Sequence, residues 1–107
     1  MHFTTLKDKS YDLGILRHAL EHSVMPYIML LELKRIVRKY VIIVNPIYCK
    51  RMFEWQNHFS VLPKRMLVNL FEKAGFDVLR YKKSSYYLNE FGDWDKEHRF
   101  LLKIKGN

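Results

Sequence analysis

The stretch VIIVNP, residues 41–46, decides the fold of this 107-residue chain. Its consecutive β-branched residues show no polar alternation, which predicts a strand buried on both faces, as in a parallel sheet covered by helices. We expect this strand over residues 40–44, because Asn45-Pro46 then breaks the pattern.

An amphipathic helix is predicted directly before this strand. It begins near Pro26, with Ser23 as a candidate cap, and its apolar stripe is Met29, Leu30, Leu33, Ile36 and Val37. Four cations, Lys34, Arg35, Arg38 and Lys39, are expected at its carboxyl end, where they complement the helix dipole. The apolar run YDLGIL (11–16) predicts an earlier buried strand, so the three elements form a right-handed βαβ unit.

A second half of similar design follows a long loop. Pro63 opens a helix and Gly75 ends it, and the stripe between them is Met66, Leu67, Leu70, Phe71 and Ala74. Strands are predicted over 76–82 and 98–105, with a polar and aromatic connection or hairpin loop over 83–97. The chain is therefore expected to be one α/β domain, residues 1–107.

Composition narrows the class of protein. Apolar residues make up 49% of the chain, which excludes a disordered tail, and no apolar run approaches the roughly 18 residues that cross a bilayer. The lone Cys49 excludes an intramolecular disulfide and suits a reducing, cytoplasmic location. The net charge of +8 favours acidic partners.

Five short motifs follow one another in an order typical of one enzyme family. They are YD (11–12), HALEH (18–22), ELKRI (32–36), VNP (44–46) and AGFDV (74–78). In this order they resemble the second half of class I S-adenosylmethionine-dependent methyltransferases. The resemblance covers residues 10–83, and the last strand less surely.

The resemblance implies a particular sheet. The family has seven strands in the order 3-2-1-4-5-7-6, and this chain would supply strands 4 to 7. We expect a partial Rossmann-like sheet ordered 4-5-7-6, mostly parallel with the last strand antiparallel, and flanked by helices.

The resemblance also implies S-adenosylmethionine as cofactor, held by a glycine-rich turn after strand 1 and an acidic residue ending strand 2. No Gly-x-Gly occurs in the sequence. We therefore expect a truncated, methyltransferase-like chain that does not bind the cofactor alone. A small basic interaction module, with nucleic acid as one ligand, is the alternative.

Candidate site residues follow the two expected parallel strands, since ligands of open α/β sheets lie beyond the strands' carboxyl ends. By resemblance, Leu16, Arg17 and His18 border the cofactor; the alternative is a solvated turn. Glu21 and His22 are either an acid/base pair or, as we favour, a helix-start carboxylate and a packing residue.

The loop after the second strand is expected to border the substrate. Asn45, Tyr48, Trp55 and His58 would wall an acceptor pocket, together with Asn57, or the aromatic residues fold back as a lid. No catalytic residue is assigned, because methyl transfer requires mostly positioning.

Other chemistry has weak support in the sequence. Lys50 and Arg51 beside Cys49 favour a thiolate, but no nucleophile pattern accompanies them. The five histidines are scattered, and only His18 and His22 share a helical spacing, so no metal site is expected. Basic residues are spread along the chain, which suits a solvated surface better than a nucleic-acid interface.

The missing half predicts an exposed sheet edge. The strand between Tyr11 and Leu16 would lose a neighbour, and an apolar unpaired edge tends to recruit another chain. We expect a homodimer, or pairing with a separate amino-terminal half, through this strand; residues 2–6 (HFTTL) folding over it is the alternative.

Overall fold

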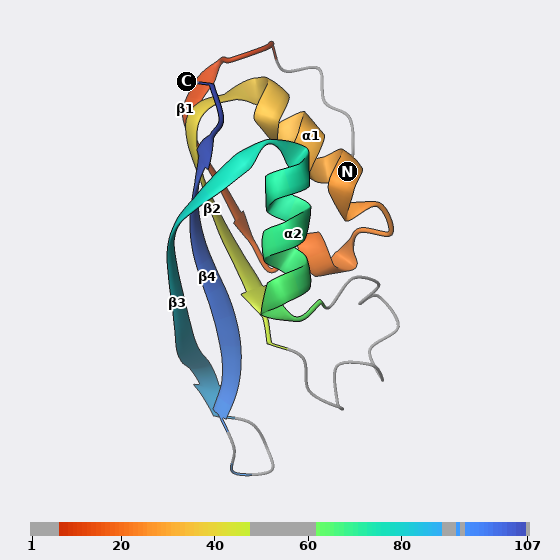
Figure 1. Ribbon diagram of the computed structural model, residues 1–107. Helices are drawn as coiled ribbons and strands as arrows, with labels where there is room; N and C mark the ends of the chain where they lie inside the picture. The colour runs from red at the N-terminus through yellow and green to blue at the C-terminus, as the bar shows by residue number, and fades with distance from the viewer. Residues whose placement is uncertain (1–6, 48–61, 89–91, 93, 107) are drawn as a thin grey trace.

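The computed structural model describes residues 7–47, 62–88, 92 and 94–106 (Figure 1). The elements in chain order are strand β1 (Tyr11–Arg17), the short 3-10 helix η1 (Leu20–His22), helix α1 (Pro26–Ile36), strand β2 (Val37–Pro46), helix α2 (Lys64–Ala74), strand β3 (Phe76–Leu88) and strand β4 (Trp94–Ile104).

The four strands form one sheet in the order β1-β2-β4-β3. Strands β1 and β2 are parallel, whereas β4 runs antiparallel to both β2 and β3. This confirms the expected order 4-5-7-6 with its antiparallel last strand. Among the described elements, β1 has only β2 as a neighbour, so it forms one edge of the sheet.

The boundaries of several elements differ from the prediction. Helix α1 ends at Ile36, and β2 starts at once with Val37, which pairs with Tyr11 of β1. Arg38 and Lys39 therefore lie on a strand and not at a helix end. Cross-strand pairing also lengthens β3 and β4 into the segment predicted as a connection, where Ser84 is opposite Glu97.

Helix α2 matches its prediction closely. It spans Lys64–Ala74 and ends at Gly75, whose φ of 98° lies in the left-handed region that suits glycine. The Gly75 amide donates to the Glu72 carbonyl at 3.1 Å and so satisfies a carbonyl at the helix end. This cap sets the direction in which the chain enters β3.

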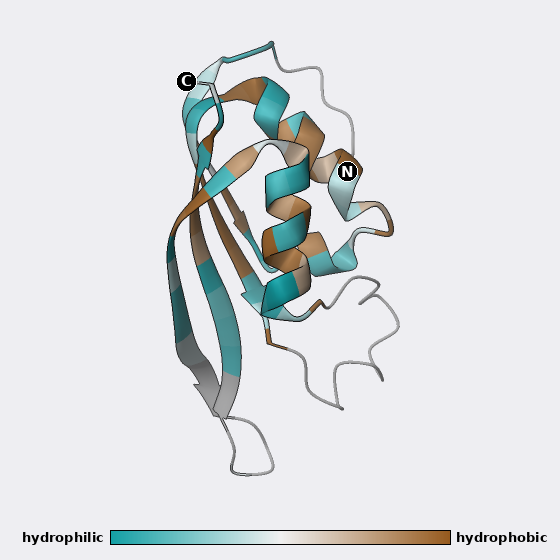
Figure 2. Ribbon diagram, in the orientation of Figure 1, coloured by the Kyte–Doolittle hydropathy of each residue, from teal (hydrophilic) through white to brown (hydrophobic). Residues whose placement is uncertain are grey.

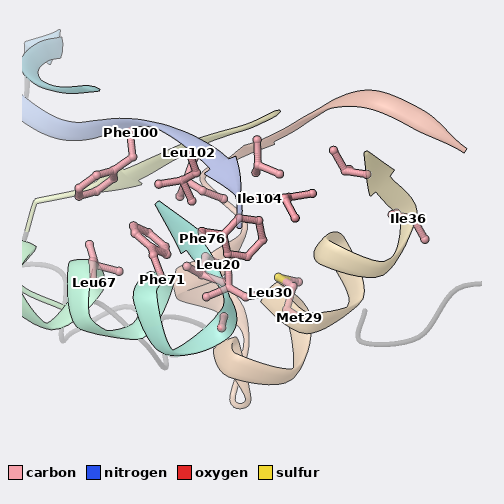
Figure 3. Packing of buried hydrophobic residues seen from close by; sticks show 14 residues of the cluster. Leu20, Met29, Leu30, Ile36, Leu67, Phe71, Phe76, Phe100, Leu102 and Ile104 are labelled. Atoms are coloured by element: carbon pink, nitrogen blue, oxygen red, sulfur yellow. The ribbon is translucent and has the colours of Figure 1, made fainter. Parts of the chain in front are cut away.

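Both helices cover the same face of the sheet (Figure 1). We call this the helix face. Phe71 of α2 meets Phe100 of β4 edge to face, with ring centroids 5.0 Å apart. Figure 3 shows the labelled side chains of the helices and strands pointing toward one another; the fully buried members include Leu30, Leu67, Phe71, Phe76, Phe100, Leu102 and Ile104.

The opposite face of the sheet has no helix over it among the described elements (Figure 1). We call it the open face. Side chains in register share a face, so it carries Ile15, Ile42, Leu101 and Arg80 in one row across the sheet. The adjoining rows are Leu13, Tyr40, Lys103 and Asp77, and Arg17, Val44, Arg99 and Lys82.

The predicted burial of β1 and of both faces of β2 is therefore wrong for the open face. Ile15 is 64% exposed, Leu13 47% and Tyr40 40%, whereas Ile43 on the helix face is fully buried. The β-branched run of β2 has the composition of a strand covered on both sides, but the described helices supply only one cover. Within the described residues, no helix has the length and apolarity needed to cross a membrane.

Candidate functional site

The carboxyl ends of β1 and β2 lie side by side, since the two strands are parallel and Arg17 is opposite Val44. The chain turns at His18, whose φ of 47° lies in the left-handed region. Its backbone amide donates to the Val44 carbonyl at 2.8 Å. This contact fixes the start of the segment that leads into η1, directly beside the end of β2.

A charged cluster joins this turn to strand β4. His18 Nε2 lies 2.8 Å from Glu97 Oε2, and the Arg99 guanidinium donates to Glu97 Oε1 from Nε at 3.0 Å and from the terminal nitrogen at 2.8 Å. The Glu97 side chain is fully buried, whereas His18 and Arg99 are 29% and 49% exposed. Glu97 therefore holds two partially exposed cationic or polar side chains in fixed positions.

These contacts keep Glu97 ionised. Burial alone would raise the pKa of Glu97, but the hydrogen bonds from Arg99 and His18 and their charges outweigh burial, so its pKa lies below the ordinary value. An imidazole held by a buried carboxylate is an arrangement that proton-transfer sites use. The same contacts also tie the end of β1 to β4.

Two other buried polar side chains lie near the strand ends. Glu21 of η1 and Asn45 of β2 are 0% and 1% exposed, and their side-chain oxygens, with the Asn45 nitrogen, have no hydrogen-bond partner in the described part of the chain. Burial raises the pKa of Glu21. Buried polar groups of this kind usually have a partner, so they are candidates for contact with a ligand or another segment.

A third polar pair lies on the helix face. The Tyr81 hydroxyl and His98 Nδ1 are 2.7 Å apart, and His98 is 6% exposed. Burial, together with the nearby charges of Lys83 and Lys64, lowers the pKa of His98 and favours a neutral ring. The Nδ1 of a neutral ring can accept a hydrogen bond from the Tyr81 hydroxyl. His98 packs at 5.9 Å from Phe100 between ring centroids, so this pair belongs to the core.

The structure brings together some of the predicted site residues. Arg17 and His18 lie at the end of β1 beside Asn45, whereas Leu16 is half-buried and packs against the hydrophobic core. Tyr48, Trp55 and His58, with Asn57 and Cys49, lie outside the described residues. Cofactor and substrate binding by all these residues stay predictions.

Neither Glu97 nor Arg99 was predicted as a site residue. Both fall at the junction between the predicted connection 83–97 and the predicted last strand. The signal that was present is the β-strand alternation of Glu97, Arg99 and Leu101, which places them on one face. Their meeting with His18 required the order of strands in the sheet.

The described residues fit only part of a site for S-adenosylmethionine. Glu21 and Asn45 offer unpaired polar atoms. No glycine-rich turn accompanies them within the described chain, because Gly14 lies inside β1 and Gly75 caps α2. A Cβ at Gly14 would lie 2.8 Å from Val37 Cγ2, so this glycine serves the close approach of β1 to its neighbour. The described residues therefore do not form a complete site for this cofactor.

Groups of acidic, histidine and cysteine side chains that would hold a metal ion are likewise absent from residues 7–47, 62–88 and 94–106.

Solved structures share this architecture at low sequence identity. An S-adenosylmethionine-dependent methyltransferase from Methanosarcina mazei superposes with a TM-score of 0.71 at 10% identity, over 95% of this chain and 63% of that one. A second S-adenosylmethionine-dependent methyltransferase, from Archaeoglobus fulgidus, superposes with a TM-score of 0.68 at 14% identity, over 92% of this chain and 62% of that one. No protein-family model and no curated protein matches the sequence.

The same architecture also carries other chemistry. The [4+2]-cyclase SpnF superposes with a TM-score of 0.75 at 11% identity, over 95% of this chain and 52% of that one. The chain thus spans about half to two thirds of the length of these structures. Fold likeness does not determine a reaction. The strand order and these superpositions together show that the chain has part of the fold of class I S-adenosylmethionine-dependent methyltransferases.

Proposed function

We propose that this chain is the carboxyl-terminal part of a methyl-transfer fold and that it functions only when another segment supplies the remaining strands. The observation that carries the proposal is β1, a parallel strand at the sheet edge with exposed Leu13 and Ile15. Parallel strands are normally flanked on both sides and covered on both faces. The incomplete cover of β1 agrees with a chain that spans only part of the similar structures.

In this proposal the cofactor is S-adenosylmethionine, and the ends of β1 and β2 border it. Leu16, Arg17 and His18 would lie on the cofactor side, with Asn45, Tyr48, Trp55 and His58 toward the methyl acceptor. The chain alone lacks a glycine-rich turn, so it would not hold the cofactor by itself. The lone cysteine suits a reducing compartment such as the cytoplasm.

The edge strand supplies the proposed route of assembly. No described strand pairs with the outer side of β1, so its backbone amides and carbonyls there could pair with an added strand. Either a second copy of the chain or a separate amino-terminal half would extend the sheet there. The alternative of a nucleic-acid-binding module is not favoured, because the similar structures include methyltransferases and a cyclase.

Calorimetric titration of the 107-residue chain with S-adenosylmethionine tests the incomplete site. We expect no binding up to about 100 μM ligand, because each absent buried hydrogen bond forgoes roughly 1 kcal/mol. The same titration of the intact Methanosarcina mazei enzyme is the positive control. Low-micromolar binding to the isolated chain would contradict the proposal.

Sedimentation velocity tests the edge. We expect the chain to associate, either with itself or with an added amino-terminal half from a similar methyltransferase. A chain that stays monomeric at several hundred micromolar, both alone and with that half, counts against assembly through β1.

A further inference from the structure

The open face divides into an apolar side and a basic side. Its apolar side chains lie on β1, β2 and the middle of β4: Leu13, Ile15, Tyr40, Ile42 and Leu101. Most of its basic side chains lie on β3 and the flanking rows of β4: Arg80, Lys82, Arg99 and Lys103. The same side carries one carboxylate, Asp77, opposite Lys103, and Arg17 lies at the end of β1. Figure 2 shows hydrophilic residues in the parts of β3 and β4 just above their grey ends.

The surface of this face is hollowed along β2, β4 and β3. A depression of about 640 Å³ is lined by Ile42 and Leu101 together with Arg80, Lys82 and Arg99, with Tyr81 and Phe100 between them. A neighbouring depression of about 440 Å³ is lined by Arg38, Lys39, Tyr40 and Lys103. Apolar and cationic groups therefore line the same continuous strip of the sheet.

Only some cations of this strip have an acidic partner among the described residues: Arg99 donates to Glu97, and Arg38 pairs with Asp12. Within the described residues Arg80, Lys82 and Lys103 form no ion pair. The nearby carboxylates have other partners: Glu97 holds His18 and Arg99, and Asp77 lies 3.8 Å from Lys105. The remaining positive charge faces outward beside exposed aliphatic side chains.

We infer that the open face docks an amphipathic helix of a partner protein, with its apolar stripe on Ile15, Ile42 and Leu101 and an acidic flank over β3. Helices are the elements that cover faces of parallel sheets. With Val44, the apolar side spans five residues along β2, from Tyr40 to Val44, or roughly 17 Å at 3.3–3.4 Å per residue. A helix of about three turns covers that length at 1.5 Å per residue.

Charge decides between this partner and the other occupants. The chain carries a net charge of +8, so a second copy would bring like charges together across a face-to-face contact. A nucleic acid would use the cations but leave Leu13 and Ile15 exposed. An acidic amphipathic helix would cover the apolar side with its apolar stripe and pair its acidic residues with the basic side.

The inference goes beyond the proposed function and needs no cofactor. The edge of β1 and the open face are separate surfaces, and the charge-reversal variant Arg80→Glu/Lys82→Glu lies on β3, on the opposite side of the sheet from that edge. Ile15→Ser lies on β1, so the charge-reversal variant is the one that separates the two proposals. If cofactor binding or assembly through β1 fails, the inference about the open face is therefore not contradicted.

The test uses a stapled 14-residue helical peptide with leucines on one face and glutamates on one flank, read by fluorescence anisotropy. The staple removes the cost of helix formation in a short peptide. Matched peptides carry lysines in place of the glutamates or the same residues in scrambled order. We expect the acidic peptide to bind at least about tenfold more tightly than either. The lysine peptide brings like charges to the basic side of the face, and the scrambled peptide does not present its leucines on one face.

Two variants locate the binding surface. The double variant Arg80→Glu/Lys82→Glu is expected to lower the affinity for the acidic peptide about tenfold and to raise the affinity for the lysine peptide. Ile15→Ser is expected to lower the affinity for both peptides severalfold, because it removes exposed apolar area from the binding surface. Arg65→Glu/Lys73→Glu on α2 makes the same charge change on exposed residues of the other layer and should leave binding unchanged.

Three results would overturn the inference. One is equal binding of the acidic and scrambled peptides to the wild-type chain, which requires no variant to fold. Another is an oligonucleotide that binds more tightly than the acidic peptide and loses affinity in Arg80→Glu/Lys82→Glu. The third is self-association that Leu101→Ser on β4, away from the edge of β1, abolishes, which would assign the face to a second copy.

Discussion

The helix face and the open face are made by the same strands, yet they differ in nearly every property. Ile43 is fully buried under the helices, whereas its neighbour in sequence, Ile42, lines a depression on the open face. Because side chains alternate along a strand, one sequence run supplies both faces. The β-branched composition of β2 is typical of a strand with both faces buried. The described helices cover only one of these faces.

The two faces also differ in charge. The helix face meets apolar stripes from α1 and α2, and its buried polar pair is Tyr81 with His98. The open face carries basic side chains on its β3 and β4 side and the buried Glu97 at its end. Stability should therefore come from the helix face, and binding from the open face and the strand ends.

The largest expected effect is a difference in stability between two isoleucine variants, one on each face of the sheet. Ile43→Ala should lower the free energy of unfolding by about 2–4 kcal/mol, since it leaves a cavity in the core. Ile15→Ala, at a side chain 64% exposed, should change it by no more than about 0.5 kcal/mol. Urea denaturation followed by circular dichroism measures both, and similar losses in the two variants would mean that Ile15 is covered in solution.

A smaller effect is expected at the strand ends. Glu97→Gln should lower the free energy of unfolding by about 1–2 kcal/mol at pH 7, because it removes a buried charge that accepts from His18 and Arg99, both partly exposed. The pKa of Glu97 is lowered in the folded chain, so its contribution is present above the unfolded value near 4.3 and is lost as pH falls through the folded value.

The measurement is a set of denaturation curves between pH 3 and 7. The gap between wild type and Glu97→Gln should narrow below about pH 4. Lys105, whose side chain lies 3.8 Å from Asp77 on the surface, offers the control: Lys105→Gln should show no comparable gap. A gap for Glu97→Gln that persists unchanged at pH 3 would contradict the role of its charge.

The smallest effect has the opposite sign. Glu21→Gln should raise the free energy of unfolding at pH 7 by on the order of 1 kcal/mol, because the carboxylate is buried without a partner among the described residues. Burial raises the pKa of Glu21, so the stability it contributes is present below the unfolded value and is lost as pH rises through the folded value.

The same pH series measures this prediction. Wild type and Glu21→Gln should converge below about pH 4, where both side chains are neutral. Destabilisation by Glu21→Gln at pH 7 would show that Glu21 has a partner outside the described residues. A charge-preserving Glu21→Asp variant separates loss of charge from loss of packing.

Much of the fold was predictable from local patterns. The β-branched run before Asn45-Pro46 predicted β2, the apolar stripe and Gly75 predicted α2, and the motif order predicted the strand order. The end of α1 was not predictable in this way. Val37 continues the helical stripe in sequence, but pairing with Tyr11 places it in a strand.

The candidate site was predictable only in part. His18 and Asn45 were found because they follow the two parallel strands. Glu97 was missed because it is 79 residues from His18 in sequence and looked like part of a polar connection.

By itself, the sequence determined which segments become helices and strands, because periodicity, β-branched runs and caps act within a few residues. The order in which the strands pair was implied by the resemblance to a known family. Only the tertiary structure decided which of those surfaces are covered. Burial depends on elements distant in sequence: the pairing of the strands brings Glu97 to His18 and leaves β1 at an edge of the described sheet, and the packing of two helices on one side separates the helix face from the open face.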